Sequence, residues 1–264
     1  MKYSDNLNLA IGAAINAGSE IMKIYESDDF GVETKGDDSP LTKADKASHY
    51  VICEALASSG LPLLSEEGAQ IPFEERSTWS RFWMIDPIDG TKEFIKKNGE
   101  FTVNIAMIQN GLPVMGVVYA PVLKELFFAE ENLGSFKMTQ VQTLEDVEKA
   151  IPADLSTASL PEIYTLVVSK SHMNAATQEF VDTKEREHGK VNAASYGSSL
   201  KICKVADGSA HCYPRFGPTM EWDTAAAHAV ASFAGCKVTQ GDEQSPLGYN
   251  KENLLNPFFI DRKS

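Results

Sequence analysis

The sequence is short of positive charge and has no long apolar run. It carries 24 Lys and Arg against 37 Asp and Glu, which gives a formal net charge of −13. Nucleic-acid polymers are bound by basic surfaces that release counterions, so this composition argues against such a ligand. No stretch reaches the roughly 18 apolar residues of a membrane-spanning helix. A small anionic substrate remains compatible with the charge if a few cations or metal ions gather around it.

Cysteine is scarce as well. The four cysteines, at positions 53, 203, 212 and 236, form no C-x-x-C pair, and we expect reduced, buried thiols in a cytoplasmic protein. Residues 1–25 have no h-region or small-residue cleavage site, so we expect no signal peptide. No basic amphipathic helix or lipidation motif supports membrane binding, although the sequence leaves peripheral association with the inner membrane open, together with the oligomeric state.

Two common catalytic arrangements are missing from the sequence. No Ser–His or Cys–His nucleophile pattern is visible, and GSSLK at residues 197–201 lacks the G-x-x-x-x-G-K spacing of a nucleoside-triphosphate loop. His228 lies five residues past Asp223, on a different face of the predicted helix, and we expect it to be structural. A mechanism without a covalent nucleophile of these types is the simplest that remains.

The 264 residues suffice for one large domain or two closely packed halves. Apolar periodicity predicts helices at 6–25 (with Asp5 as the cap), 45–57, 176–188, 198–207 and 223–233, and strands at 61–65, 82–85, 101–109, 112–119, 126–129, 164–170 and 210–214. Asn110-Gly111 between two of these strands is a strong hairpin signal. A polar segment near 138–161 predicts a seam between an antiparallel α+β half (1–137) and an α/β half (138–264).

One short stretch, FWMIDPIDGTKEF at residues 82–94, places two aspartates at the mouth of an apolar strand. Repulsion and desolvation make this arrangement unfavourable. A helix cap explains one of Asp86 and Asp89, but not both. A hard divalent cation between them would stabilise both carboxylates. Gly90 and Thr91 then open a predicted turn of helix, whose N–H groups and dipole suit an anion.

Other acidic residues occur at similar places. Glu66 and Glu67 follow a predicted strand, and Asp45 and Asp223 lie near helix starts. Individually these positions are more typical of solvated turns and N-caps. Taken with the aspartate pair, they predict Mg²⁺ ions at one site. Two such ions about 3.5–4 Å apart form the clamp typical of phosphoryl hydrolysis.

Three segments in this order, S-E-E, D-P-I-D-G-T and W-D-T-A-A, resemble the signatures of the lithium-sensitive, magnesium-dependent inositol monophosphatase superfamily. The resemblance covers essentially the whole chain. It is strongest to the bacterial 3'(2'),5'-bisphosphate nucleotidases of the CysQ type, through DPIDGTKEFIKKNGEFTVNIA, YGSSLKICKVADG and YPRFGPTMEWDTAA. It implies a sandwich of alternating α and β layers (αβαβα), with an α+β half followed by an α/β half.

The resemblance also implies roles for individual residues. The metal ligands would be the side chains of Glu66, Asp86, Asp89 and Asp223 and the backbone carbonyl of Ile88. Thr91, paired with Asp45, would orient the attacking water. Gly90 and Thr91 would contact the substrate phosphate through their backbone, and Glu66 and Asp223 would also face the substrate. Glu67 lies where relatives often have a second acid near a weaker metal site, so two or three Mg²⁺ ions are expected.

A second substrate phosphate needs positive charge in the C-terminal half. Lys201, with Ser198, lies at a predicted helix start, and Arg215 offers a bidentate guanidinium. A solvated lysine and an Arg215–Glu221 pair are equally good interpretations of the residues alone. The resemblance favours binding, since nucleotidases of this group use matching lysine and arginine positions.

Hydroxyl and aromatic side chains in the same half are weaker candidates for substrate contacts. Ser169 and Ser171 match the segment of the family's substrate loop, and Tyr196, Tyr213 and Phe216 are candidates for covering an adenine.

From these residues and the resemblance we expect a Mg²⁺-dependent phosphatase that converts adenosine 3',5'-bisphosphate to AMP and phosphate. Relatives often also accept 3'-phosphoadenylyl sulfate, which would place the enzyme in sulfur metabolism. Two alternatives stay open. One is hydrolysis of inositol phosphates or fructose 1,6-bisphosphate at the same metal site, and the other is a sensor that binds metal and nucleotide without turnover. The pairing of Asp45 with Thr91 argues against the sensor, because a binder needs no water-activating pair.

Overall fold

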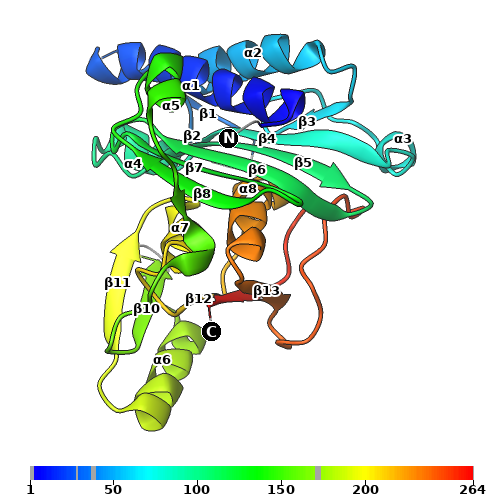
Figure 1. Cartoon of the computed structure of the whole chain (residues 1–264). Helices are drawn as coiled ribbons and strands as arrows, with labels where there is room; N and C mark the ends of the chain where they lie inside the picture. Colours follow the sequence, from blue (N-terminus) through cyan, green and yellow to red (C-terminus); the bar gives the residue numbers. More distant parts are fainter. Residues whose placement is uncertain (1–2, 28, 37–39, 170–173, 264) are drawn as a thin grey trace.

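The computed structural model describes residues 3–27, 29–36, 40–169 and 174–263. Its elements form the expected αβαβα stack (Figure 1). Helices α1 (Asp5–Glu26) and α2 (Lys43–Ala57) cover one face of a seven-stranded sheet. Helices α7 (Leu200–Ala206) and α8 (Glu221–Phe233) fill the layer between this sheet and a five-stranded one. Helix α6 (Ala175–His188) lies beyond the second sheet.

The first sheet has the strand order β3-β4-β5-β6-β7-β8-β9. Its strands are β3 (Leu63–Ser65), β4 (Arg81–Asp89), β5 (Thr102–Gln109), β6 (Leu112–Ala120), β7 (Glu125–Glu130), β8 (Gly134–Thr139) and β9 (Ala153–Asp154). β3 pairs with β4 in parallel and all other pairs are antiparallel. The predicted hairpin between β5 and β6 is confirmed. Asn110 and Gly111 both have positive φ, 51° and 78°, as a type I′ turn requires.

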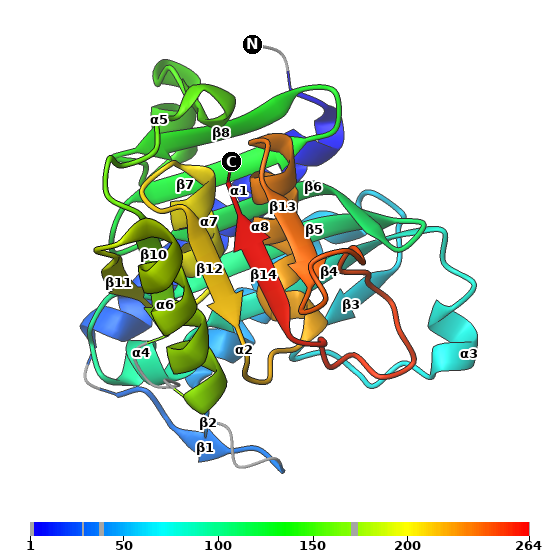
Figure 2. The same cartoon turned by 90° about the horizontal axis from the view of Figure 1, so that it is seen from below.

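The second sheet has the order β11-β10-β12-β14-β13 (Figure 2). Its strands are β10 (Thr165–Ser169), β11 (Asn192–Tyr196), β12 (Cys212–Arg215), β13 (Lys237–Gln240) and β14 (Phe259–Arg262). β10 is parallel to β11 and β12, whereas β14 is antiparallel to both of its neighbours. The smaller elements are β1 (Glu33–Thr34), β2 (Pro40–Leu41), α3 (Phe73–Arg76), α4 (Thr91–Ile95), α5 (Leu144–Lys149) and η1 (Leu155–Thr157).

Small side chains let α8 pack directly on the first sheet. Its alanines at 225–227, 229 and 231 are buried. A Cβ on Gly116 of β6 would lie 2.1 Å from the carbonyl oxygen of Ala226. This close packing brings the start of α8, which carries Asp223, to the same edge of the sheet as the end of β4.

Several sequence expectations need correction. Ser4 caps α1, through its side chain and Leu7 N–H, where Asp5 was expected. β4 continues through both aspartates to Asp89, beyond the predicted end at Ile85. The division predicted at 137/138 falls within β8, and the first sheet continues to β9. The strands β8, β9, β11, β13 and β14 were not predicted.

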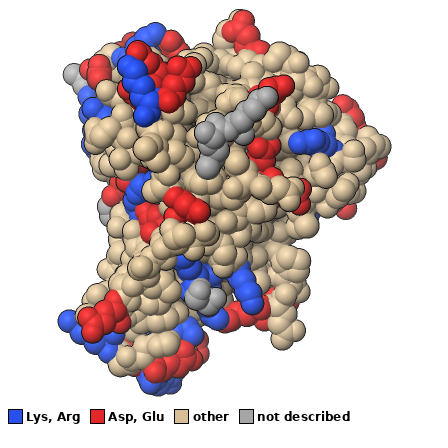
Figure 3. Space-filling model, viewed as in Figure 1, with Lys and Arg blue, Asp and Glu red and all other residues tan. Residues whose placement is uncertain are grey.

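Among the described residues no helix is both long and apolar enough to cross a bilayer. On the face drawn in Figure 3, acidic and basic side chains are interspersed, and the described Lys and Arg residues there form no continuous basic surface. All four cysteines are free, and three of them, Cys203, Cys212 and Cys236, are buried.

Candidate active site

The end of β4 carries the two aspartates on an irregular stretch of strand. The register against β5 shifts between Asp86 and Asp89, which is a local bulge in the pairing. Asp86 is buried, and its Oδ1 accepts a hydrogen bond of 3.0 Å from Ile88 N–H. Its Oδ2 is buried and has no hydrogen-bond partner among the described residues. A buried carboxylate oxygen rarely stays unpaired, so this atom is oriented for a ligand.

Glycine is required directly after Asp89. Gly90 has φ 94° and lies against the backbone of the following loop, since a Cβ there would come 3.3 Å from Glu100 O. This left-handed residue ends the strand and lets α4 begin at Thr91. The strand end and the helix start are thereby brought onto one turn.

Asp45 lies in the first turn of α2, as predicted. Its Oδ2 accepts hydrogen bonds from Thr42 N–H (2.7 Å) and Thr42 Oγ1 (2.5 Å), which completes a capping box. Its Oδ1 lies 3.2 Å from Thr91 Oγ1. Burial raises the pKa of Asp45, against the hydrogen bonds from Thr42. The structure therefore brings together the acid and the hydroxyl that the sequence analysis paired.

Glu66 and Glu67 follow β3 and share one cation. Lys35 Nζ donates to Glu66 Oε1 at 2.8 Å and also to Glu67 Oε1. Burial lowers the pKa of Lys35, but its bonds to the two glutamates outweigh burial and the net shift is upward. Lys35 was not identified from the sequence, because its polar segment has no distinctive pattern.

Asp223 reaches the cluster from the first turn of α8. Its Oδ2 accepts a hydrogen bond of 2.8 Å from Met220 N–H at the helix start. Burial and the charge of Asp89 raise the pKa of Asp223 well above its ordinary value. Burial likewise raises the pKa of Asp86 well above its usual range, and the neighbouring carboxylates raise it further. For Asp89, burial raises the pKa to about 6 against the opposing charge of Lys201.

The candidate metal ligands therefore lie close enough to perturb one another. Among the described residues, no three His, Cys, Asp or Glu side chains are already arranged as a finished metal-binding group. Glu66 uses Oε1 for Lys35 and Asp223 uses Oδ2 for the Met220 N–H, so only binding of a cation through these same oxygens would require a change of partner. The donors are all hard oxygens, and Asp86 Oδ2 is unpaired within the part of the chain that the structure describes. This donor set fits Mg²⁺ and does not fit a soft metal.

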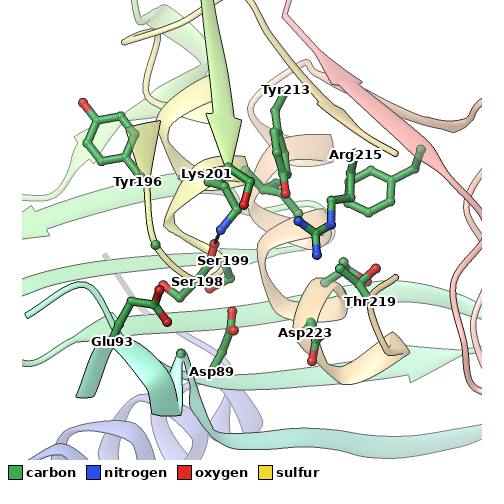
Figure 4. Close-up of a pocket in the computed structure, with 16 residues that line it drawn as sticks. Asp89, Glu93, Tyr196, Ser198, Ser199, Lys201, Tyr213, Arg215, Thr219 and Asp223 are labelled. Carbon is green, nitrogen blue, oxygen red and sulfur yellow. Dashed lines mark hydrogen bonds between the residues drawn. The ribbon is translucent and has the colours of Figure 1, made fainter. Parts of the chain in front are cut away.

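Glu66, Asp86, Asp89 and Asp223 line a cavity of about 400 Å³, together with Ile88 and Thr91. A second cavity of about 140 Å³ adjoins it, shown in close-up in Figure 4. The two cavities have six lining residues in common: Asp89, Gly90, Glu93, Arg215, Thr219 and Asp223. The second cavity is also lined by Lys201 and Ser198. The cationic side chains of the second cavity therefore adjoin the acidic side chains of the first.

Lys201 and Arg215 both point into the second cavity (Figure 4). Lys201 Nζ donates to Ser198 O at 2.5 Å, and burial lowers the Lys201 pKa to about 8. Arg215 is buried, with Nη2 bonded to Pro218 O at 2.7 Å, and its Nε has no partner among the residues that the structure describes. The alternative pairing of Arg215 with Glu221 is wrong, because Glu221 bonds Lys251 and two backbone N–H groups instead.

The weaker candidates separate into two groups. Tyr196 and Ser169 line the second cavity, whereas Ser171 lies outside the described residues. Phe216 does not line it, and contacts Phe180 and Phe258 edge to face. Tyr213 lines the cavity but is only 2% exposed, so Tyr196 is the better candidate for an adenine contact.

A buried hydroxyl network, which was not predicted from the sequence, supports the loop before α7. Ser199 Oγ donates to Asn104 Oδ1 at 2.8 Å and lies 2.9 Å from Thr102 Oγ1. Both partners belong to β5. Gly197 N–H also donates to Glu100 Oε2 at 2.8 Å. The only signal of this network in the sequence was the match of FTVNIA to the nucleotidase pattern. That match did not indicate which residues the side chains of Thr102 and Asn104 would contact. Outside the cavities, His228 is structural as expected and bonds Tyr249 at 2.8 Å.

Comparison with known proteins agrees with this geometry. Residues 2–258 match the model of the inositol monophosphatase family. The chain is 44% identical over 250 residues to the 3'(2'),5'-bisphosphate nucleotidase CysQ of Escherichia coli strain K12, covering 93% of this chain and 95% of that protein. The Shigella flexneri protein of the same name gives the same identity and coverage.

Solved structures point the same way. The crystal structure of CysQ from Bacteroides thetaiotaomicron has 46% identity and a TM-score of 0.90, covering 98% of this chain and 97% of that one. The IMPase of Thermotoga maritima, at 22% identity and a TM-score of 0.73, shares the fold, and the alignment covers 98% of this chain and 92% of that one.

Proposed function

Since the chain belongs to the inositol monophosphatase family, we propose that it is a Mg²⁺-dependent phosphatase that removes the 3'-phosphate of adenosine 3',5'-bisphosphate, giving AMP and phosphate. The nucleotidases at 44% identity support this substrate class. By the same reasoning 3'-phosphoadenylyl sulfate is a second substrate, which places the reaction in sulfur metabolism. We propose a cytoplasmic location, which cell fractionation tests directly.

The observation that carries the proposal is the continuity of the two cavities. One is lined by Glu66, Asp86, Asp89 and Asp223, the donor set for hard cations. The other holds Lys201 and Arg215, the two cations suited to a second phosphate. A monophosphate has no need for the second group, whereas a nucleotide bisphosphate occupies both.

Two or three Mg²⁺ ions are proposed for the acidic cavity. Glu66, Asp86, Asp89, Asp223 and the carbonyl of Ile88 would hold them, with Glu67 beside the weakest site. Bound Mg²⁺ supplies Lewis-acid activation of water and stabilises charge on the phosphoryl oxygens.

The chain's own residues orient the water and the substrate. Thr91 donates its hydroxyl proton to Asp45 Oδ1, which leaves the Oγ1 lone pairs free to accept a hydrogen bond from water. The backbone N–H groups at the start of α4 face the scissile phosphate. Lys201 and Arg215, supported by the Ser198 loop, bind the other phosphate, and Tyr196 contacts the base.

Parallel phosphate-release assays test the substrate. Adenosine 3',5'-bisphosphate, inositol 1-phosphate and fructose 1,6-bisphosphate are compared with Mg²⁺ at saturation. We expect a preference of about 100-fold for the nucleotide, which equals about 2.7 kcal/mol of transition-state discrimination. Comparable rates on all three would favour a general phosphomonoesterase on the same metal site. Nucleotide binding without phosphate release from any of them would favour the sensor. Inhibition by millimolar Li⁺, which membership of the family implies, provides a second check on the metal site.

A further inference from the structure

One face of α2 contacts three separate segments of the candidate metal site. Asp45, Ser48 and His49 lie at positions i, i+3 and i+4 of the helix, and therefore on the same side of it. Asp45 contacts Thr91 at the start of α4, as described above. Ser48 and His49 were assigned no role by the sequence analysis, yet each bonds a segment that carries a proposed metal ligand.

Ser48 holds the turn between the two aspartates. Its side chain is fully buried, and Oγ donates to Pro87 O at 2.8 Å. Pro87 lies inside the bulge of β4, where the backbone has no regular ladder partner to fix it. Ser48 thereby fixes the Pro87 carbonyl against α2. The next carbonyl oxygen, that of Ile88, lies 3.3 Å from Thr91 Oγ1 and faces this hydroxyl.

His49 holds the end of β3. Its Nδ1 lies 2.8 Å from Ser65 Oγ, and Ser65 directly precedes Glu66. A tight turn follows, closed by Gly68 N–H donating to Ser65 O at 3.0 Å. The sulfur of Cys53, one helical turn further along α2, packs 3.7 Å from Nδ1 and 3.8 Å from Nε2. The imidazole is thus fixed on one side by packing and on the other by a hydrogen bond.

These contacts point to a role beyond core filling. A side chain that only fills space can be apolar, whereas Ser48 and His49 present polar atoms to partners on β4 and β3. Each contact is made to the residue just before a proposed metal ligand, since Pro87 precedes Ile88 and Ser65 precedes Glu66. Groups bonded directly to metal ligands typically change metal affinity by about 10- to 100-fold when they are lost, and for contacts one residue further away we expect the lower end of that range.

We propose that Ser48 and His49 are positioning residues, which hold the Pro87–Ile88 and Ser65–Glu66 backbone segments in the arrangement that binds the divalent cation. The proposal rests on the proposed function only in requiring that the acidic cavity binds Mg²⁺. Its test therefore uses metal binding measured without substrate, so that a wrong substrate assignment leaves it intact.

Two replacements of His49 distinguish the effect of losing its hydrogen bond to Ser65 from the effect of losing the imidazole ring. His49→Asn places an amide group close to the position of Nδ1, whereas the longer amide of His49→Gln lies near Nε2, away from Ser65. Mg²⁺ affinity is measured by isothermal titration calorimetry on the full chain after removal of metal, and folding by thermal unfolding in EDTA. We expect the dissociation constant to rise about tenfold in His49→Gln and to stay within about threefold of wild type in His49→Asn.

Equal affinities in wild type and His49→Gln would overturn the role of His49, and so would equal losses in both variants, which would indicate packing alone. Ser65→Ala tests the same bond from the other side. It should weaken Mg²⁺ binding by itself and add nothing to His49→Gln. Full additivity of the two changes would also contradict the proposal.

Ser48→Ala tests the second contact with a smaller change. We expect a similar loss of Mg²⁺ affinity, because the Pro87 carbonyl loses its tie to α2. Tyr50→Gln is the matched control, since Tyr50 lies on the same helix with 66% of its surface exposed. Unchanged Mg²⁺ affinity in Ser48→Ala, or an equal loss in Tyr50→Gln, would overturn the assignment of Ser48.

Discussion

Thr91 Oγ1 donates to Asp45 Oδ1 across 3.2 Å, joining the first turn of α4 to the first turn of α2. The other oxygen of Asp45 is fully engaged by Thr42. The carboxylate therefore has a fixed orientation, and the Thr91 hydroxyl has two acceptors within reach, Asp45 Oδ1 and, at 3.3 Å, the carbonyl oxygen of Ile88. An acid with one oxygen committed to structure and one to a hydroxyl is suited to orient a water molecule and less suited to bind a cation.

Removing the Thr91 hydroxyl should abolish most turnover. Thr91→Val keeps the shape of the side chain but cannot relay a proton to Asp45, so we expect kcat to fall about 10²- to 10⁴-fold. Thr91→Ser retains the hydroxyl and should keep most of the activity. Steady-state assays on adenosine 3',5'-bisphosphate at saturating Mg²⁺ measure both variants. Equal rates in Thr91→Val and wild type would assign the water-orienting role elsewhere.

Asp89→Asn should separate stability from activity. The pKa of Asp89 is raised to about 6 in the fold against 3.8 for the free side chain, so the native state binds more protons than the unfolded state between these values. Its ionisation therefore costs stability as pH rises through this window. In EDTA at pH 7.5 we expect Asp89→Asn to unfold at a higher urea concentration than wild type. Its turnover should nevertheless fall by orders of magnitude, and Mg²⁺ should no longer raise its melting temperature. A less stable variant would indicate that Asp89 mainly supports the fold.

The acidic residues could be predicted from sequence because their signal is local. Asp86 and Asp89 lie three positions apart with proline and glycine beside them, and each further acid follows a strand or starts a helix. Periodicity predicted most of the larger helices and strands, and the family resemblance implied their layer order. Both signals depend on near neighbours in the chain, which a sequence displays directly.

The supporting contacts could not be predicted, because they join distant segments. Ser199 meets Asn104 across 95 positions, and Ser48 meets Pro87 across 39. The strands β11 and β13 were missed because their residues are only partly buried and do not alternate clearly. Arg215 and Glu221 are near in sequence and were considered a pair, but each has other partners in the fold.

Substrate binding should weaken at alkaline pH because Lys201 loses its charge. Burial lowers its pKa to about 8, so the free enzyme loses this positive charge as pH rises through 8. We expect KM for adenosine 3',5'-bisphosphate to increase between pH 7 and pH 9, with a smaller change for inositol 1-phosphate. Lys201→Arg keeps its charge over this range and should flatten the profile. A wild-type KM that is constant to pH 9 would show that Lys201 does not contact the second phosphate.

Gly197→Ala should disturb the nucleotide cavity through the backbone. An added Cβ would lie 2.5 Å from Glu100 O, a backbone atom that cannot rotate away. The next residue, Ser198, already has a positive φ of 48°, so the loop has little room to adjust. We expect a loss of about 1–3 kcal/mol in unfolding free energy, together with a higher KM for the nucleotide.

Gly12→Ala on α1 is the matched control for this change, because its Cβ would make only an ordinary contact of 3.8 Å. We expect that variant to be more stable than wild type by about 0.5–1 kcal/mol. If Gly197→Ala is as stable and active as Gly12→Ala, the close approach at Glu100 is not a constraint.

Asp261, which is not one of the candidate metal ligands, should lower the stability of the fold in a pH-dependent way. It lies on β14 with 0% exposure, and neither carboxylate oxygen has a hydrogen-bond partner among the described residues. Burial raises its pKa well above the ordinary value, only partly offset by Lys263. The folded state therefore keeps a proton that the unfolded state releases above about pH 4. Stability should fall as pH rises, by up to about 1.4 kcal/mol per pH unit, until the folded carboxyl ionises too.

Urea unfolding of Asp261→Asn and Asp261→Leu in EDTA checks this linkage. Both variants should be more stable than wild type at pH 7.5, and the difference should shrink towards pH 4.5. Asp242 offers the opposite case, because hydrogen bonds from Ser245 and Gln244 lower its pKa. Its contribution is present above the unfolded pKa and is lost on acidification, so Asp242→Asn should be less stable than wild type at pH 7.5 and equal to it in acid. If the Asp261 variants instead show the same pH trend as Asp242→Asn, the buried carboxyl is paired in solution and ionised in the native state.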